Sequence, residues 1–430
     1  MDNQTTNFDI VISGGGLSGS LMALSLADLK KSDGTLLSIA IVESALPLNS
    51  NSKQNTSNAS MFDNRVLALS HGSSSYLKKL NVWQHLANAA CPIEQIDISD
   101  KGYYGKARLK AEEQGVNALG YVIEMALIGE AQLNVLSNKS NIKWFSPDRI
   151  KDIQWQPNKK EDDLLSSTNC KVGITLDSGK ILQTKLLLAC DGVNSPCRAL
   201  AGIKVNQHDY KQVALIANVA TRKPHNNKAF ERFTKFGPLA MLPLTQLKSQ
   251  TNTEKASDNR CSLVWTMTQE QSEKILALSD TDFRQQLENY FGSWLGEITQ
   301  VGKREVYPLV LKQAAQQTYH RMALIGNASH TIHPIAGQGF NLGLRDVQQI
   351  SSLIEHALVK NMDIGSFALL NEYAQERQFD QNQVIGLTDA LVTLFSNDYL
   401  PLVIGRNIGL KVMNYVSPIK NTLVNKLMGY

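Results

Sequence analysis

Cysteine is scarce in this sequence, and its pattern excludes two common kinds of site. The five cysteines form no Cys-x-x-Cys pair, so neither a zinc ribbon nor a redox dithiol is indicated. Their odd number and wide spacing favour free thiols in a cytoplasmic protein over a disulfide framework. They are Cys91, Cys170, Cys190, Cys197 and Cys261.

The sequence also lacks a large excess of positive or negative charge, and it lacks long apolar runs. The net charge is only +4, and no basic stripe is interleaved with aromatics, so nucleic acid is not an expected partner. No uncharged apolar run reaches the roughly 20 residues that span a bilayer. The polar start of the chain does not read as a signal peptide. We therefore expect a cytoplasmic protein, and 430 residues leave room for two domains.

The N-terminal region predicts a strand, a helix and a second strand. Phe8–Ile12 is a short β-branched run typical of a buried strand. Leu17–Leu29 has helical apolar spacing, and Leu37–Glu43 predicts another buried strand. Consecutive elements of this kind form a right-handed βαβ unit with parallel strands.

Three glycines between the first strand and the helix match the pattern G-x-G-x-x-G. Gly14 permits the tight turn, Gly16 lets the backbone approach a pyrophosphate at the helix N-terminus, and Gly19 lets the helix pack on the strand. Glu43 ends the second strand, where a carboxylate can bind the ribose hydroxyls of an adenosine. The alternative is a glycine turn without a ligand, and this unit alone does not distinguish FAD from NAD.

Two later motifs favour FAD. Asp191-Gly192 follows one predicted strand, and Gly326-Asn327 follows another, Met322–Ile325. In open α/β sheets, ligands bind at the carboxyl ends of the strands. FAD is long enough to need a second anchor for its ribityl chain and flavin, whereas an NAD dehydrogenase has no need of such a pair.

A third glycine-rich segment enters a long predicted helix at Gly337, Gly339 and Asn341. Its glycines allow the backbone to lie close to a planar ring. The helix N-terminus would stabilise the negative charge of a reduced flavin. Pro334 and Gln338 are therefore candidates for lining the reaction side of the flavin.

Two histidines precede this segment. His330 and His333 are candidates for assisting phenol deprotonation, because histidine titrates near neutral pH. We favour the alternative that they are structural loop histidines. A His-x-x-His metal site is a third interpretation, but no further ligands stand at metal spacing, so we expect no metal.

In this order, the glycine turn, Asp191-Gly192 and Gly326-Asn327 resemble the three motifs of the FAD-dependent aromatic hydroxylases. Residues 229–233, 237–243, 330–346 and 403–410 are similar to the ubiquinone-biosynthesis branch of that family. The likeness covers nearly the full length. It implies an α/β fold: a Rossmann-like FAD-binding domain of the glutathione-reductase type, similar to para-hydroxybenzoate hydroxylase, with a β-sheet substrate domain and C-terminal helices.

The resemblance also implies an activity. It implies a monooxygenase that hydroxylates the ring of a polyprenylated methoxyphenol in ubiquinone biosynthesis, with FAD, O2 and NAD(P)H, through a flavin C4a-hydroperoxide. Alternatives are another ring hydroxylase of the same branch, a flavin-dependent reductase or oxidase on this fold, and a flavoprotein scaffold without activity.

The family pattern assigns roles to three further residues. It places Arg65 near the flavin and its phosphates, and it assigns Asp191 and Arg198 to nicotinamide contact. Where the family usually has aspartate, this chain has Asn327. Asparagine keeps a carbonyl acceptor for a ribityl hydroxyl but loses the charge, so we expect FAD to bind, but more weakly.

Domain boundaries can be predicted from these segments. The FAD-binding domain would comprise 1–75, 111–195 and 306–360, and the substrate domain 76–110 and 196–305, followed by a C-terminal helical region over 361–430. Around Asp177-Ser-Gly179 the pattern predicts a hairpin. Short strand-like runs at 213–219, 239–244 and 261–267 predict a separate sheet.

The last segment, 386–430, is strongly apolar with scattered basic residues. One interpretation is that it packs on the core of the protein or on another protein of ubiquinone biosynthesis. The other is peripheral contact with the inner face of the membrane, which would suit a polyprenyl substrate drawn from lipid.

Overall fold

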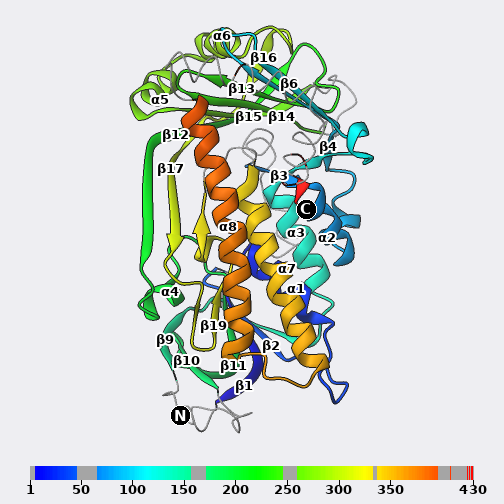
Figure 1. Ribbon diagram of the computed structural model, residues 1–430, viewed down its shortest axis with the longest axis vertical. Helices are drawn as coiled ribbons and strands as arrows, with labels where there is room; N and C mark the ends of the chain where they lie inside the picture. The colour runs from blue at the N-terminus through cyan, green and yellow to red at the C-terminus, as the bar shows by residue number, and fades with distance from the viewer. Residues whose placement is uncertain are drawn as a thin grey trace.

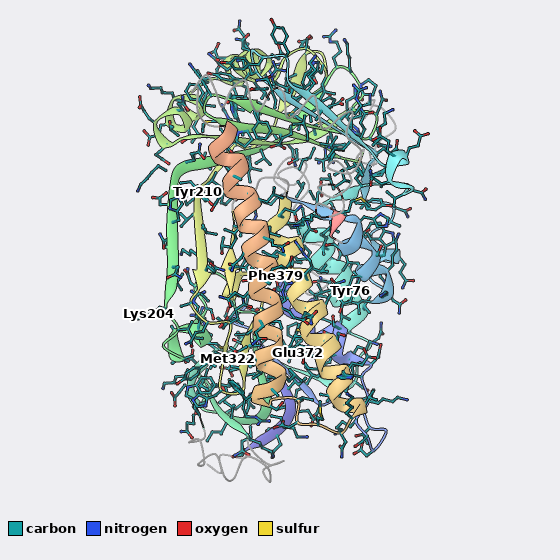
Figure 2. All side chains as sticks on the ribbon, in the orientation of Figure 1. Tyr76, Lys204, Tyr210, Met322, Glu372 and Phe379 are labelled. Atoms are coloured by element: carbon teal, nitrogen blue, oxygen red, sulfur yellow. The ribbon has the colours of Figure 1, made fainter. Side chains whose placement is uncertain are left out.

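The computed structural model describes residues 5–45, 65–155, 171–245, 259–332 and 337–395, together with Asn407, Val424, Lys426, Met428 and Gly429. Two large sheets lie at opposite ends of the described structure (Figure 1). The long strands β12 (Val205–Thr221) and β17 (Glu305–Ala314) run from the lower end to the upper sheet. In Figure 2, Lys204 and Tyr210 are labelled at a lower and a higher level along this edge of the molecule.

The lower sheet is built around the βαβ unit. Strand β1 (Thr6–Ser13) lies parallel to β2 (Ile39–Val42) on one side and to β11 (Ile181–Ala189) on the other, and α1 (Leu17–Ala27) connects β1 to β2. The predicted unit is therefore confirmed. The remaining described strands of this sheet are β8 (Ile142–Phe145), β9 (Ile150–Gln154), β10 (Val172–Leu176), β18 (Thr318–Tyr319) and β19 (Met322–Leu324). Strands β10 and β11 form the predicted hairpin.

Both faces of the lower sheet are buried, which explains why its strands read as continuous apolar runs. On one face, Ile10 and Ile12 share a core with Leu21 of α1 and with residues of four further helices. These helices are α2 (His71–Lys79), α3 (Met125–Leu136), α7 (Gln338–Val359) and α8 (Phe367–Phe395). On the other face, Val11 and Leu187 belong to a second core.

The upper sheet is mostly antiparallel, and among the described residues it has nine strands. Besides β12 and β17 it contains β5 (Gln95–Asp100), β6 (Lys106–Lys110), β13 (Lys228–Thr234), β14 (Gly237–Pro243), β15 (Arg260–Thr268), β16 (Ile298–Val301) and β20 (His330–Thr331). The predicted strands at 213–219, 239–244 and 261–267 lie in it as β12, β14 and β15. Helices α5 (Gln269–Leu276) and α6 (Asp280–Phe291) cover its outer face.

A small three-stranded sheet connects the two halves. It consists of β3 (Val66–Ser70), β7 (Gly120–Glu124) and β4 (Cys91–Ile93). Its Val122 and Ile93 pack against Ala229 and Leu244 of the upper sheet. The remaining short helices are α4 (Pro196–Leu200) and the 3-10 turns Trp83–His85, Glu112–Gln114 and Gly326–Ala328.

The course of the chain through the two sheets differs from the predicted domain boundaries in two places. Leu77 and Leu86 lie in the core beside α1, so the segment that begins at 76 belongs to the lower half as far as β4. Strand β17, predicted as part of the FAD-binding domain, pairs with β12 in the upper sheet. Both differences arise because the chain crosses between the sheets several times. The division into two domains itself remains a proposal.

The described residues of the tail pack on the protein itself. Val424 and Met428 are almost fully buried against Leu109 and Leu119. Lys426 donates a hydrogen bond to Gln383 of α8 at 2.9 Å. For these residues the contacts favour the core interpretation, and most of the predicted amphipathic faces lie outside the described residues. No helix of the described part is long and apolar enough to cross a membrane.

Candidate active site

The surroundings of the three glycines in the glycine turn differ from one position to the next. Gly14 has a φ of +92°, and a Cβ atom added there would lie 2.6 Å from the carbonyl oxygen of Cys190. A Cβ at Gly19 would lie 1.8 Å from the carbonyl oxygen of Gly14. A Cβ at Gly16, the N-cap of α1, would meet nothing within 4 Å. Protein packing therefore explains Gly14 and Gly19, whereas Gly16 borders open space at a helix N-terminus.

Glu43 lies against this turn. Its Oε2 accepts a hydrogen bond from the backbone N–H of Gly15 at 2.6 Å, and its Oε1 accepts from Ser44 and Ala45. The carboxylate thus stands beside the glycine turn at the end of β2, as the sequence predicts. Its contact with a ribose remains a prediction.

Asp191 lies at the carboxyl end of β11, next to the end of β1. Its Oδ2 accepts from the N–H of Cys197 at 3.0 Å and from the hydroxyl of Ser13 at 3.4 Å. Its Oδ1 is buried and has no hydrogen-bond partner in the described structure. Gly192 has a φ of +82°, and a Cβ there would meet nothing within 4 Å. A buried carboxylate oxygen without a partner is costly unless a ligand or water supplies a donor.

The Gly326-Asn327 turn follows β19, which lies parallel to β11. Gly326 has a φ of +59°, and a Cβ there would lie 3.0 Å from the hydroxyl of Ser18, in the first turn of α1. Asn327 is exposed. The glycine turn, Asp191 and Gly326-Asn327 therefore meet at one edge of the sheet, as the sequence predicts.

Arg198 connects two of these motifs. Its guanidinium donates to the carbonyl of Val193 at 2.8 Å and to the carbonyl of Ala328 at 2.7 Å. These bonds hold the Asp191 turn and the Asn327 turn together. The contacts account for Arg198 as a structural residue and give no support to the nicotinamide contact that the family pattern implies.

Asn341 also has a structural role. Its Oδ1 accepts from the N–H of Ser70 and the hydroxyl of Ser73, and its Nδ2 donates to the carbonyls of Ala68 and Gly337. Protein groups therefore occupy the side-chain amide through four hydrogen bonds, which give no support to a side-chain contact with the cofactor; cofactor binding at Asn341 remains a prediction. Asn341 fixes the start of α7 against β3.

The other residues of this segment lie at the start of α7. Gly337 has a φ of +63°, and a Cβ there would lie 2.8 Å from the Cβ of Ala68. Gln338 is buried in the first turn, and the nearest atom to a Cβ at Gly339 would be 3.9 Å away. Pro334 and His333 lie outside the described residues.

His330 lies in a buried charge network. Its Nε2 is 2.9 Å from Oδ2 of Asp346, which also accepts the N–H of Gly326 at 2.8 Å. Oδ1 of Asp346 accepts from Arg377 of α8 at 2.6 Å. Burial alone would raise the pKa of Asp346, but His330 and Arg377 hold that pKa below its usual value. These contacts favour the structural interpretation of His330 over the catalytic one.

Arg65 is exposed and directly precedes β3, on the side of the upper sheet. Its guanidinium carbon lies 6.0 Å from the centre of the Tyr307 ring in β17. Ala68, which contacts Gly337, follows three residues later. Arg65 therefore stands near the start of α7, and its contact with flavin phosphates remains a prediction.

The residues of this edge fit an FAD. The open backbone at Gly16 and the N-terminus of α1 suit a pyrophosphate. The unpartnered Oδ1 of Asp191 and the exposed Asn327 supply polar groups for a longer cofactor. Burial raises the pKa of the Cys190 thiol, so this neighbour is neutral and apolar. The fold and the site together define a dinucleotide-binding flavoprotein.

Comparisons with known proteins identify the family. The model of the FAD binding domain family matches residues 169–387. The chain is 32% identical to the ubiquinone hydroxylase UbiL of Rhodospirillum rubrum, over 98% of this chain and 89% of that protein. It is 29% identical to the mitochondrial ubiquinone biosynthesis monooxygenase COQ6 of Homo sapiens, over 97% of this chain and 92% of that one. The chain belongs to the FAD-binding monooxygenase family, and it is an FAD-dependent monooxygenase.

Solved structures agree with the fold. The p-nitrophenol 4-monooxygenase PnpA of Pseudomonas putida superposes with a TM-score of 0.73 over 99% of each chain, at 14% identity. The protein PqsL of Pseudomonas aeruginosa, solved with 2-aminobenzoylacetate, superposes with a TM-score of 0.72 at 17% identity, over 94% of this chain and 99% of that one. The predicted fold, an FAD-binding α/β half with a second sheet and C-terminal helices, is confirmed.

Proposed function

We propose that this protein hydroxylates the aromatic ring of a polyprenylated phenol in ubiquinone biosynthesis, with a 2-polyprenyl-6-methoxyphenol as the substrate class. The main support is the meeting of three motifs that fit FAD at one sheet edge, in a chain similar over nearly its full length to a ubiquinone hydroxylase and to a ubiquinone biosynthesis monooxygenase. NAD(P)H is the proposed electron donor.

We assign the following roles in cofactor binding to residues of this chain. Gly16 and the first turn of α1 hold the pyrophosphate, and Glu43 binds the ribose. Asp191 and Asn327 bind the ribityl hydroxyls. The N-terminus of α7, fixed by Asn341, directs its partial positive charge at the flavin ring.

When bound, reduced FAD supplies the activation of O2 that allows one oxygen atom to enter the ring. The protein must bind the phenol, orient the reacting carbon and exclude water from the site. The inner face of the upper sheet is the part of the chain that we assign to substrate binding.

The test is product analysis under 18O2 with FAD-loaded protein, NADPH and a short-chain 2-prenyl-6-methoxyphenol. We expect one labelled oxygen atom in a new ring hydroxyl. Oxidised nicotinamide with unlabelled product would instead indicate a reductase or oxidase on this fold. A protein without flavin that also fails to take up added FAD would contradict the proposal.

A further inference from the structure

The inner face of the upper sheet carries a row of partly exposed side chains. Five residues lie in register across β5, β13, β14, β15 and β12, and their side chains point to the same side. They are Ile98, Glu231, Ala240, Val264 and Ile216, and each is partly exposed. The opposite face of the sheet is buried, because Phe230, Leu239 and Trp265 pack against α6. Among these five residues of the row only Glu231 has a carboxyl group, and Glu305 of β17 follows next in register beside Ile216.

The row faces the side on which the flavin ring is expected. Ala229 lies on the same side as Glu231, one pleat away, and packs against Val66 of β3. Two residues further along β3, Ala68 contacts Gly337 at the start of α7. Because Glu231 and Ala229 lie on the same side of β13, Glu231 lies on the face of the upper sheet that packs toward β3, the strand next to the N-terminus of α7.

Glu231 has no partner among the residues that the structure describes: its carboxyl group makes no hydrogen bond and no ion pair with them. Burial raises the pKa of Glu231 to about 7, and burial is the sole cause. The adjacent Arg232 points to the outer face, where its guanidinium lies 5.0 Å from the centre of the Trp294 ring.

Other charged groups on the inner side leave Glu231 unpaired. On β5 the nearest is Asp100, and on β15 Arg260 is bonded to Glu124 of β7 at 3.1 Å. At the far end of the row, on β17, Glu305 pairs with Lys303 and lies near Arg65. Strand β14 places only apolar residues on this side. None of these groups contributes to the pKa of Glu231.

We propose that Glu231 is the proton acceptor for the phenol hydroxyl of the substrate; the proposal rests on the function proposed above. The substrate O–H bond breaks, its proton bonds to a carboxylate oxygen of Glu231, and the electron pair stays on the phenolate oxygen. That electron pair activates the ring carbons ortho and para to the oxygen. The carboxyl group returns the proton to water after the product leaves.

The surroundings suit this role. A general base works best when its pKa lies near the working pH, and a carboxylate held in apolar surroundings meets that condition. Ile98, Val264 and Ile216 would contact the ring and keep water from it. A buried structural carboxyl would be expected to have a cation or a backbone N–H as a partner, and Glu231 has neither among the described residues.

The test compares Glu231→Gln, which keeps the shape but cannot accept the proton, with Glu273→Gln on the exposed side of α5. The first readout needs no turnover: 2-prenyl-6-methoxyphenol is titrated into each FAD-loaded protein at pH 7.5, and the ultraviolet band of the phenolate is followed. We expect the band with wild type and Glu273→Gln, and not with Glu231→Gln.

The second readout is the pH profile of kcat/KM. Wild type should lose activity below about pH 7, and Glu231→Gln should fall by roughly 100-fold or more and lose that acidic limb. A ring-fluorinated substrate that is already ionised at the assay pH should restore most of the activity of Glu231→Gln. Rescue of this kind is not expected if Glu231 only supports the fold.

The outcomes separate the two proposals. If wild type hydroxylates the prenylated phenol and Glu231→Gln keeps both the phenolate band and the pH limb, Glu231 is not the acceptor and the proposed function stands. If wild type hydroxylates no prenylated phenol, both proposals fail. If Glu231→Gln does not retain FAD, Glu231→Asp decides: a variant that retains FAD but lacks the acidic limb overturns the assignment.

Discussion

Replacing Gly16 by valine separates ligand binding from folding at the glycine turn. At this position an added Cβ meets no protein atom within 4 Å, and the backbone has an ordinary negative φ of −67°. The substitution therefore costs the apo protein only the weaker N-cap, about 0.5–1 kcal/mol. The same change at Gly19 would force a Cβ to 1.8 Å from a carbonyl oxygen and should prevent folding.

For FAD binding, in contrast to folding, we expect a large effect of Gly16→Val. The valine side chain would occupy the space that the pyrophosphate needs next to the backbone N–H groups of α1. We expect FAD affinity to fall by at least about 100-fold, which corresponds to about 2.7 kcal/mol. The matched control is Gly386→Val in α8, where an added Cβ also meets nothing within 4 Å. It should bind FAD normally and be neutral or slightly stabilising, because glycine weakens a helix interior.

The assay is thermal unfolding of apo protein during an FAD titration. Wild type and Gly386→Val should gain about 2.7 kcal/mol at an FAD concentration 100 times Kd, with a matching rise in Tm. Gly16→Val should start from nearly the wild-type apo Tm and gain at most about 0.4 kcal/mol at the same FAD concentration, because that concentration is then no higher than its own Kd. If Gly16→Val binds FAD with wild-type affinity, the pyrophosphate does not lie at this turn and the site is wrongly placed.

Three further predictions follow from the same contacts. Asn327→Asp should leave the apo Tm unchanged and keep or tighten FAD binding, as measured by flavin fluorescence quenching; a severe loss of affinity would mean that Asn327 contacts another group. Asp346→Asn should cost about 3–5 kcal/mol in urea unfolding, because it leaves the buried Arg377 without its carboxylate. The pKa of Asp346 is lowered in the folded state, so the ionised carboxylate contributes its full stabilisation above the ordinary pKa of 3.8 and loses it as the pH falls further. Wild type should therefore lose this contribution in acid, and Asp346→Asn should not. Parallel acid unfolding transitions of the two proteins would contradict the network. Met428→Ala should cost about 2–5 kcal/mol, because Met428 is 3% exposed, whereas Phe379→Ala at a position that is 68% exposed on α8 (Figure 2) should be nearly neutral; equal effects would contradict the packing of the tail.

The lower sheet was predictable because its signals are local. Gly14 and Gly19 stand where backbone atoms come too close for a side chain, and that requirement is visible in a six-residue pattern. Asp191 and Gly326 could be placed at one edge because parallel strands bring their carboxyl ends together. Here short segments and general rules of sheet topology were sufficient.

The structural role of Asn341 was not predictable in the same way. Its four hydrogen bonds reach Gly337, four residues away, and Ala68, Ser70 and Ser73, about 270 residues away. A glycine-rich segment that enters a helix indicates a ligand site, but no local pattern shows that the asparagine is already occupied by protein. His330 is a similar case, because its partner Asp346 lies on the next helix and no spacing rule connects them.

Glu231 was missed although the sequence contains a weak signal. It stands in a strand among Ala229, Phe230 and Phe233, so a charged side chain interrupts an otherwise largely apolar segment. The alternation of residues along a strand does not by itself show which face of the sheet packs against the core. Only the register across five strands shows that Phe230 faces α6 and that Glu231 faces the layer of β3 and α7.

The structure also explains why asparagine can stand at position 327. The turn is held from both sides by other residues: Asp346 accepts the N–H of Gly326, and Arg198 donates to the carbonyl of Ala328. Neither bond involves the side chain between them, which is exposed. The conformation of the turn therefore does not depend on a carboxylate at this position. Exchanging asparagine and aspartate should change what a ligand meets and leave the fold as it is, so any effect of Asn327→Asp reports on the cofactor.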